Sequence, residues 1–145
     1  MGVNLPEETA IEAVHTARVR SYLASFSTGE PLSVSANVTD DFVNKHLGVL
    51  GGGCEGKIAY EARLENFLTS FAQLRYDALA VVTDAQTGSA RYDMHFRQNG
   101  TDFTVPGIMW FDFKDGLIAR RIDCWDGLTY LRQAKADANA IAAML

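Results

Sequence analysis

Apolar residues recur with a helical period in the first half of the chain and with a period of two in much of the second half. From Pro6 to Gly29 they return at roughly every third or fourth position, and a proline followed by acids suits the first turn of a helix. A short second segment covers residues 30–38. Residues 57–74 give the clearest amphipathic helix, with apolar side chains along one side and charges opposite.

Strict alternation of apolar and polar residues predicts β-strands, and most of these lie after residue 75. The expected strands are 40–48, 76–85, 88–98, 102–113 and 116–126. Asn99-Gly100 and Asp115-Gly116 are strong hairpin signals between the last three. An alanine-rich helix is expected over 128–145, with Asp126 as its N-cap.

This order of elements predicts an α+β fold in one domain spanning residues 1–145. Helices come first and an antiparallel meander comes last, so a long curved sheet is expected to wrap around the helices. Such a cone has a pocket at its open end, where ligands commonly bind.

Composition and charge narrow the class of partner. The net charge of −5 argues against non-specific binding to nucleic acid, which needs a basic surface. No apolar run approaches the length of about 18 residues needed to span a membrane, and the N-terminus does not resemble a signal peptide. A cytoplasmic protein acting on a small molecule is therefore expected.

The sequence shows no metal or cofactor motif. The two cysteines, Cys54 and Cys124, lie far apart, and the three histidines have no ligand-type spacing, so neither a metal nor a cofactor is expected. The glycine-rich stretch 49–56 lacks the ending of a phosphate-binding loop and is interpreted as a flexible segment at the pocket rim.

Alternation in the last three strands separates candidate pocket residues from their neighbours. In 88–98, Arg91, Asp93 and His95 share one face, and Ala90 and Tyr92 lie on the other. Six side chains of these strands are expected to converge on the concave face of the sheet. They are Arg91, Asp93, Ile108, Trp110, Asp123 and Trp125.

Two carboxylates and an arginine in an apolar pocket would provide acid–base chemistry. Two neighbouring carboxylates do not both ionise cheaply, and an arginine between them lets one stay ionised while the other keeps its proton. Such a site offers a general base and a general acid at the same pH. The alternative is a buried Arg–Asp pair that only satisfies its own hydrogen bonds.

The order helix–helix–strand–helix–meander resembles the NTF2-like superfamily, which includes ketosteroid isomerase and the SnoaL polyketide cyclases. Within it, Arg91-Tyr92-Asp93 is similar to the Arg-x-Asp motif of limonene-1,2-epoxide hydrolase. Asp123, which follows the Asp115-Gly116 turn and precedes the segment Cys124-Trp125-Asp126, is similar to that family's second aspartate.

The resemblance implies one-step hydrolysis of a hydrophobic epoxide to a vicinal diol, without metal. Asp123 would activate the water, Asp93 would protonate the epoxide oxygen and Arg91 would bridge the two. The family's water-binding tyrosine and asparagine correspond best to Phe42 and Asn44, although Phe42 has no hydroxyl. His46 or His95 would be candidates to replace that donor.

Two other functions remain open from the sequence. The same pocket would serve a SnoaL-like cyclase or isomerase that uses one acid as its base, or a non-catalytic ligand-binding or assembly domain. The superfamily also implies a homodimer through the outer face of the sheet. The apolar residues assigned to that outer face are Tyr92, Met94, Phe96, Met109, Phe111 and Phe113.

Overall fold

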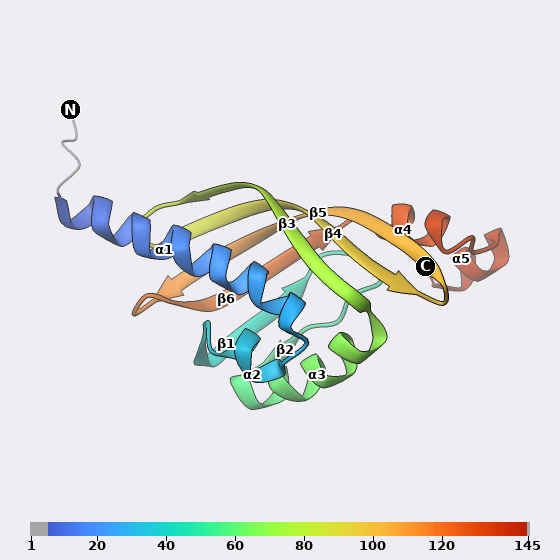
Figure 1. The fold of residues 1–145 in the computed structure, drawn as a ribbon, viewed down its shortest axis with the longest axis horizontal. Coiled ribbons are helices and arrows are strands. Elements are labelled where there is room, and N and C mark those ends of the chain that lie inside the picture. Colours follow the sequence, from blue (N-terminus) through green and yellow to red (C-terminus); the bar gives the residue numbers. More distant parts are fainter. Residues whose placement is uncertain (1–5, 145) are drawn as a thin grey trace.

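A computed structural model describes residues 6–144, which form one curved six-stranded sheet with helices on its concave side and at its open end (Figure 1). The helical elements are α1 (Pro6–Ser25), a 3₁₀ turn (Phe26–Thr28), α2 (Pro31–Ser35), α3 (Lys57–Ser70), α4 (Gly127–Gln133) and α5 (Ala138–Met144). The strands are β1 (Val38–His46), β2 (Cys54–Glu55), β3 (Ala72–Thr83), β4 (Thr87–Gln98), β5 (Thr101–Lys114) and β6 (Leu117–Trp125). The α+β architecture expected from the sequence is confirmed.

The sheet has the strand order β2-β1-β6-β5-β4-β3. Strands β3 to β6 form the expected antiparallel meander, and β1 joins it in parallel beside β6. This parallel pairing sets His46, at the end of β1, opposite Asp123 of β6. The topology thus brings the first strand and the last strand together at the open end.

Two local expectations need correction. The glycine-rich stretch 49–56 contains the short strand β2, which pairs with β1. The C-terminal helix is divided, because Lys135 has a positive φ of 56° and Asp137 begins a new helix by accepting a hydrogen bond from Ala140 N at 2.7 Å. Residue 145, at the end of the expected helix, lies outside the described residues.

The faces of β4 and β5 are the reverse of those expected. The apolar residues assigned to an outer dimer patch are the buried core, with exposures of 0–7 %. They are Tyr92, Met94, Phe96, Met109 and Phe111, and Phe113 packs against them. The physical reason is simple: the apolar face of an amphipathic strand is the one that the helices cover.

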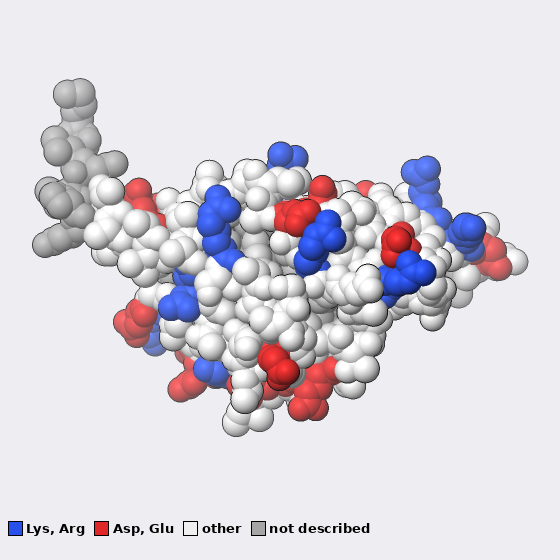
Figure 2. All heavy atoms as spheres, in the orientation of Figure 1, with Lys and Arg blue, Asp and Glu red and all other residues white. Residues whose placement is uncertain are grey.

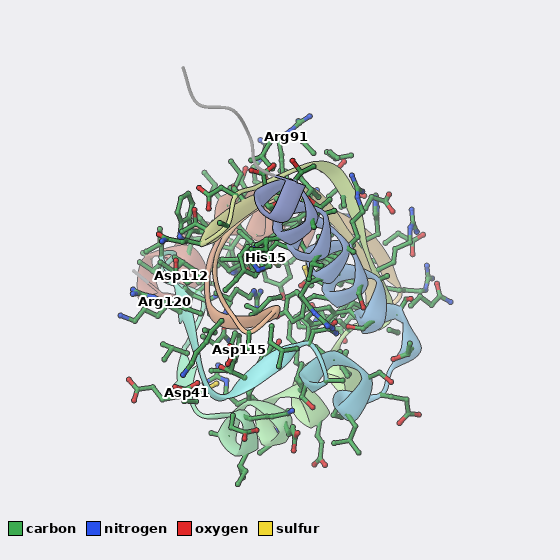
Figure 3. All side chains as sticks on the ribbon, turned by 90° about the vertical axis from the view of Figure 1, so that its left-hand side faces the viewer. His15, Asp41, Arg91, Asp112, Asp115 and Arg120 are labelled. Atoms are coloured by element: carbon green, nitrogen blue, oxygen red, sulfur yellow. The ribbon has the colours of Figure 1, made fainter. Side chains whose placement is uncertain are left out.

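The polar face of β4 consequently lies on the outside of the sheet. Arg91 is exposed there, as Figure 3 shows, and Asp93 on the same face is partly exposed. His95, on that face as well, contacts Thr104 and Asp77 of the adjacent strands at 2.9 Å each. On β5, Ile108 and Trp110 face outward with 53 % and 45 % exposure. The expected position of these five residues in the pocket is wrong.

Strand β6 contributes its polar alternate residues to the interior. The pairing register with β5 shifts between Asp112 and Phe113. Because of this irregularity, Ile118 and Arg121 are both buried although simple alternation would place them on opposite faces. Arg121 and Asp123 are 5 % and 3 % exposed on the inner side. Asp123 and Trp125 therefore occupy the expected face.

The face of the molecule shown in Figure 2 has mixed charge. Figure 2 shows Lys and Arg side chains interspersed with Asp and Glu over the visible face, without a continuous basic region. Within residues 6–144, no helix has the length and apolar character that a bilayer span requires.

Candidate functional site

A cavity of about 760 Å³ opens between α3, α4 and the inner face of the sheet. Its walls are mainly aromatic and aliphatic, and the aromatic members include Phe26, Phe67, Phe71, Phe96, Trp125 and Tyr130. Asn66, Ser70 and Gln98 add polar groups to the lining. A largely apolar cavity with a few convergent polar groups is the usual form of a small-molecule site.

Asp123 is the one carboxylate among the described residues that line this cavity. Tyr92 Oη donates a hydrogen bond to its Oδ1 at 2.6 Å, and Arg121 Nη2 donates to its Oδ2 at 2.6 Å. Tyr92 reaches this position because Gly107, its cross-strand neighbour, has no side chain: a Cβ there would collide with the tyrosine hydroxyl and ring. Asp123 is thus held in one orientation by two donors.

Arg121 is the buried cation that balances Asp123. Its Nη1 donates to Asn44 Oδ1 at 3.2 Å, and its guanidinium lies over the ring of Tyr22 at 5.9 Å from the centroid. The Nε of Arg121 has no hydrogen-bond partner among the described residues. Nearby Tyr22 and Asp123 raise the pKa of Arg121 despite the opposing effect of burial, so the guanidinium remains charged.

All five tyrosines of the chain lie around this pair or line the cavity. Tyr22 and Tyr60 share a hydrogen bond at 2.5 Å, and Tyr130 donates to Gln98 at 2.7 Å. Tyr76 also lines the cavity. Burial raises the pKa of Tyr76 far above its usual value, so it is a neutral donor available to a ligand.

His46 borders the same polar group. Its Nδ1 lies 3.9 Å from Asp123 Oδ2, beyond hydrogen-bond distance, and is buried without a partner in the described part of the chain. Burial, with a further effect from Arg121, lowers the pKa of His46 to about 4. The imidazole is therefore neutral at neutral pH.

The glycine-rich loop forms one wall of the cavity. Arg63 of α3 fastens it by donating to the carbonyl oxygens of Gly52 and Gly53 at 2.8 and 2.9 Å. Gly51 lies against His46, where a Cβ would come within 2.6 Å of the imidazole Cγ. This close approach of backbone to ring explains why glycine occupies the position.

The sequence-predicted site residues fall into two groups. The cavity lining includes Asp123, Asn44 and Trp125. Phe42 is fully buried beside it and packs against Tyr60 at 4.7 Å between ring centroids. The other five lie on the outer face: Arg91, Asp93, His95, Ile108 and Trp110.

The acid–arginine–acid set is therefore not assembled, and a different Arg-x-Asp occupies the site. Arg121-Ile122-Asp123 repeats the spacing of Arg91-Tyr92-Asp93, but on a strand whose polar face points inward. A signal in the sequence distinguishes the two motifs. On the face of β4 opposite Arg91 and Asp93, Tyr92 belongs to a row of large apolar residues that needs burial. Tyr76, Tyr92 and Arg121 were not anticipated as site residues.

Comparison with known proteins places these features in a family context. Residues 19–121 match a family model described as a SnoaL-like domain. No curated protein matches the chain.

Solved structures share the fold at low identity. A protein of Xanthomonas campestris pv. campestris assigned as a polyketide cyclase has 21 % identity and a TM-score of 0.75, with 85 % of this chain and 98 % of that chain covered. An LEH-like epoxide hydrolase of M. tuberculosis has 15 % identity and a TM-score of 0.74, with 96 % and 97 % covered. At such identities the likeness establishes the fold and not the reaction.

Proposed function

The chain belongs to the SnoaL-like domain family, within the NTF2-like fold, and from that premise we propose that it is an acid–base enzyme of the cyclase or isomerase type. The substrate would be a small, largely apolar carbonyl compound. The observation that carries the proposal is Asp123, a carboxylate fixed by Tyr92 and Arg121 at an otherwise apolar cavity.

In this proposal Asp123 takes a proton from the carbon next to the substrate carbonyl. The C–H bond breaks, its electron pair moves onto the carbonyl oxygen, and an O–H bond forms on Asp123. In isomerisation the resulting enolate takes the proton back from Asp123 at another carbon. In cyclisation it forms a C–C bond to a second carbonyl of the same molecule, the π pair of that carbonyl moves onto its oxygen, and the alkoxide so formed takes the proton from Asp123.

The neighbouring groups suit the charge that this step creates. Negative charge leaves Asp123 and appears on the substrate oxygen, to which the neutral hydroxyl of the cavity-lining Tyr76 would donate. Arg121 remains charged on either side of the step and stabilises both positions of the negative charge. The aromatic walls exclude bulk water and strengthen these interactions.

Epoxide hydrolysis is the second candidate. The observation that favours it is the proximity of Asn44 and Asp123 through their shared partner Arg121, because together they would hold a water molecule for attack. Arg91 and Asp93 take no part in such a scheme, and a tyrosine would have to protonate the epoxide oxygen. The two-carboxylate mechanism needs a second acid, and the described cavity lining contains no carboxylate besides Asp123. Proton abstraction by a single base is therefore the better supported reaction.

Hydrogen–deuterium exchange tests the proposal. We would incubate the protein with 2-tetralone, a bicyclic ketone with acidic α-protons, in D₂O and follow loss of the α-proton signals by NMR. We expect exchange above the buffer rate that falls about 10²–10⁴-fold in Asp123→Asn. Asp93→Asn, on the outer face, is the matched control and should retain the wild-type rate.

Parallel incubation with cyclohexene oxide separates the alternatives. Diol formation that depends on Asp123, without ketone exchange, would replace the proposal with hydrolysis. If 2-tetralone and larger ketones bind but neither exchange nor diol formation occurs, the protein would be a ligand-binding domain and not an enzyme of either type.

A further inference from the structure

We propose that His46 is a second substrate-binding group and that, together with Asp123, it selects a hydroxyl or enol oxygen of the substrate. The inference deepens the proposed function: it rests on that proposal for the place of Asp123 at the substrate, and it adds a chemical class to the ligand. The substrate would be a carbonyl compound that also carries a hydroxyl or an enolised second carbonyl.

The distance between the two residues is the first argument. His46 Nδ1 and Asp123 Oδ2 are 3.9 Å apart, too far to bond directly. Two atoms at this separation can both form a hydrogen bond of about 2.8 Å to a third atom placed beside them. Both residues line the cavity, but Nδ1 itself is covered where Gly51 lies against the imidazole, so a ligand atom takes the third position only when the loop backbone at Gly51 moves aside.

The unmet hydrogen-bonding capacity of His46 is the second argument. Its Nδ1 is buried and has no partner among the described residues, and a buried polar atom without a partner is costly. Asp123 Oδ2 already accepts from Arg121, and a carboxylate oxygen has room for a second donor. A ligand oxygen that satisfies both atoms would relieve this cost.

The polarity of the pair then specifies the ligand. Asp123 Oδ2 only accepts, and its negative charge favours the histidine tautomer with the proton on the facing Nδ1. The bridging atom must therefore accept from His46 and donate to Asp123. A hydroxyl or enol oxygen does both, whereas a ketone or ether oxygen would be repelled by the carboxylate.

The surroundings keep His46 neutral and in place. The charged groups that face it are Arg121 and Asp123 from β6 and Arg63 from α3, and the loop side contributes the uncharged Gly51. The pKa of His46, lowered to about 4, supports a neutral donor at working pH. Arg63 and Gly51 are positioning residues, since they hold the loop against the imidazole ring.

A matched pair of probes tests this selectivity. 2-Naphthol and 2-methoxynaphthalene have the same ring system, but only the first has a hydrogen to donate. Binding of each would be measured by calorimetry with wild type, His46→Leu and His46→Asn, the last of which keeps an N–H near the position of Nδ1. His95→Leu, on the outer face, is the control histidine.

We expect wild type to prefer 2-naphthol by about tenfold or more, the effect of one good hydrogen bond to a charged group. The preference should fall below about threefold in His46→Leu, remain in His46→Asn, and be unchanged in His95→Leu. Nitrogen-15 NMR of the wild type should show a neutral imidazole protonated at Nδ1, and the bound naphthol should perturb it.

The inference is overturned if wild type binds both probes equally or binds neither, or if His46→Leu keeps the preference. A neutral imidazole protonated only at Nε2 in the complex would also overturn it. Ketone exchange without hydroxyl selectivity would remove the role of His46 and leave the proposed function standing. Hydroxyl selectivity without ketone exchange would overturn the proposed function and leave the role of His46 in binding.

Discussion

Replacing Arg121 with methionine should destabilise the protein far more than removal of one surface ion pair. The guanidinium and its partner Asp123 are 5 % and 3 % exposed, and Nη2 lies 2.6 Å from Oδ2. Methionine keeps much of the side-chain volume but leaves the carboxylate buried without its cation, and breaking such a pair costs about 3–5 kcal/mol. A domain of this size has only about 5–15 kcal/mol of stability in total.

Urea denaturation monitored by circular dichroism measures the effect. With a slope of about 2 kcal/mol per molar, the midpoint should fall by about 1.5–2.5 M at pH 7. The double variant R121M/D123L should recover part of the loss, because no charge is then left unpaired, with a coupling energy of about 2–3 kcal/mol.

Two results would refute this reasoning. One is a loss below about 1 kcal/mol in the single variant, which would mean that water in the cavity screens the pair as it screens a surface pair. The other is a double variant whose loss equals the sum of the two single losses, because the residues would then not be coupled.

Three further predictions concern other parts of the fold. Gly107→Ala should cost about 1–3 kcal/mol by thermal unfolding and lower any Asp123-dependent activity, since the added Cβ displaces Tyr92. The free energy of unfolding of the wild type should fall as pH drops from about 6.5 towards 4. The pKa of His46 is lowered to about 4 in the folded state, so the unfolded state binds more protons in this range. His46→Asn should flatten this dependence of stability on pH. If a second copy covers the outer face around the exposed Ile108 and Trp110, Trp110→Glu should convert a dimer to a monomer in light scattering.

Each of these has its own control. Gly48→Ala should be nearly silent, because the nearest atom to its new Cβ is a carbonyl oxygen at 3.9 Å, and an equal loss there would argue against the Tyr92 explanation. His95→Asn should keep the acid slope if His46 is its source. A wild-type protein that is monomeric at micromolar concentration would end the dimer proposal.

Periodicity alone determined most of the secondary structure. Lys57–Ser70 is a helix because its apolar residues follow a helical period, and the hairpins fall at Asn99-Gly100 and Asp115-Gly116 because these pairs favour tight turns. Both second positions, Gly100 and Gly116, have positive φ values. These are local properties, and neighbouring residues carry all the information they need.

Alternation also defined the two faces of each strand, but not which face points inward. For β4 the apolar row of Tyr92 and Met94 is buried, whereas the acid–base chemistry that Arg91 and Asp93 would provide favoured the opposite assignment. For β6 the inward face is polar, which the hydrophobic effect on a single strand does not predict.

The composition of the site was decided by the tertiary structure. Arg121 and Asp123 tolerate burial only because Tyr92 and Asn44, from two other strands, supply their hydrogen bonds. His46 reaches Asp123 through the parallel pairing of β1 with β6, and these residues are 77 positions apart in the sequence. Electrostatic compensation between distant segments depends on distances in space, so only the assembled fold shows that Arg121 and Asp123 are buried with these partners at the cavity.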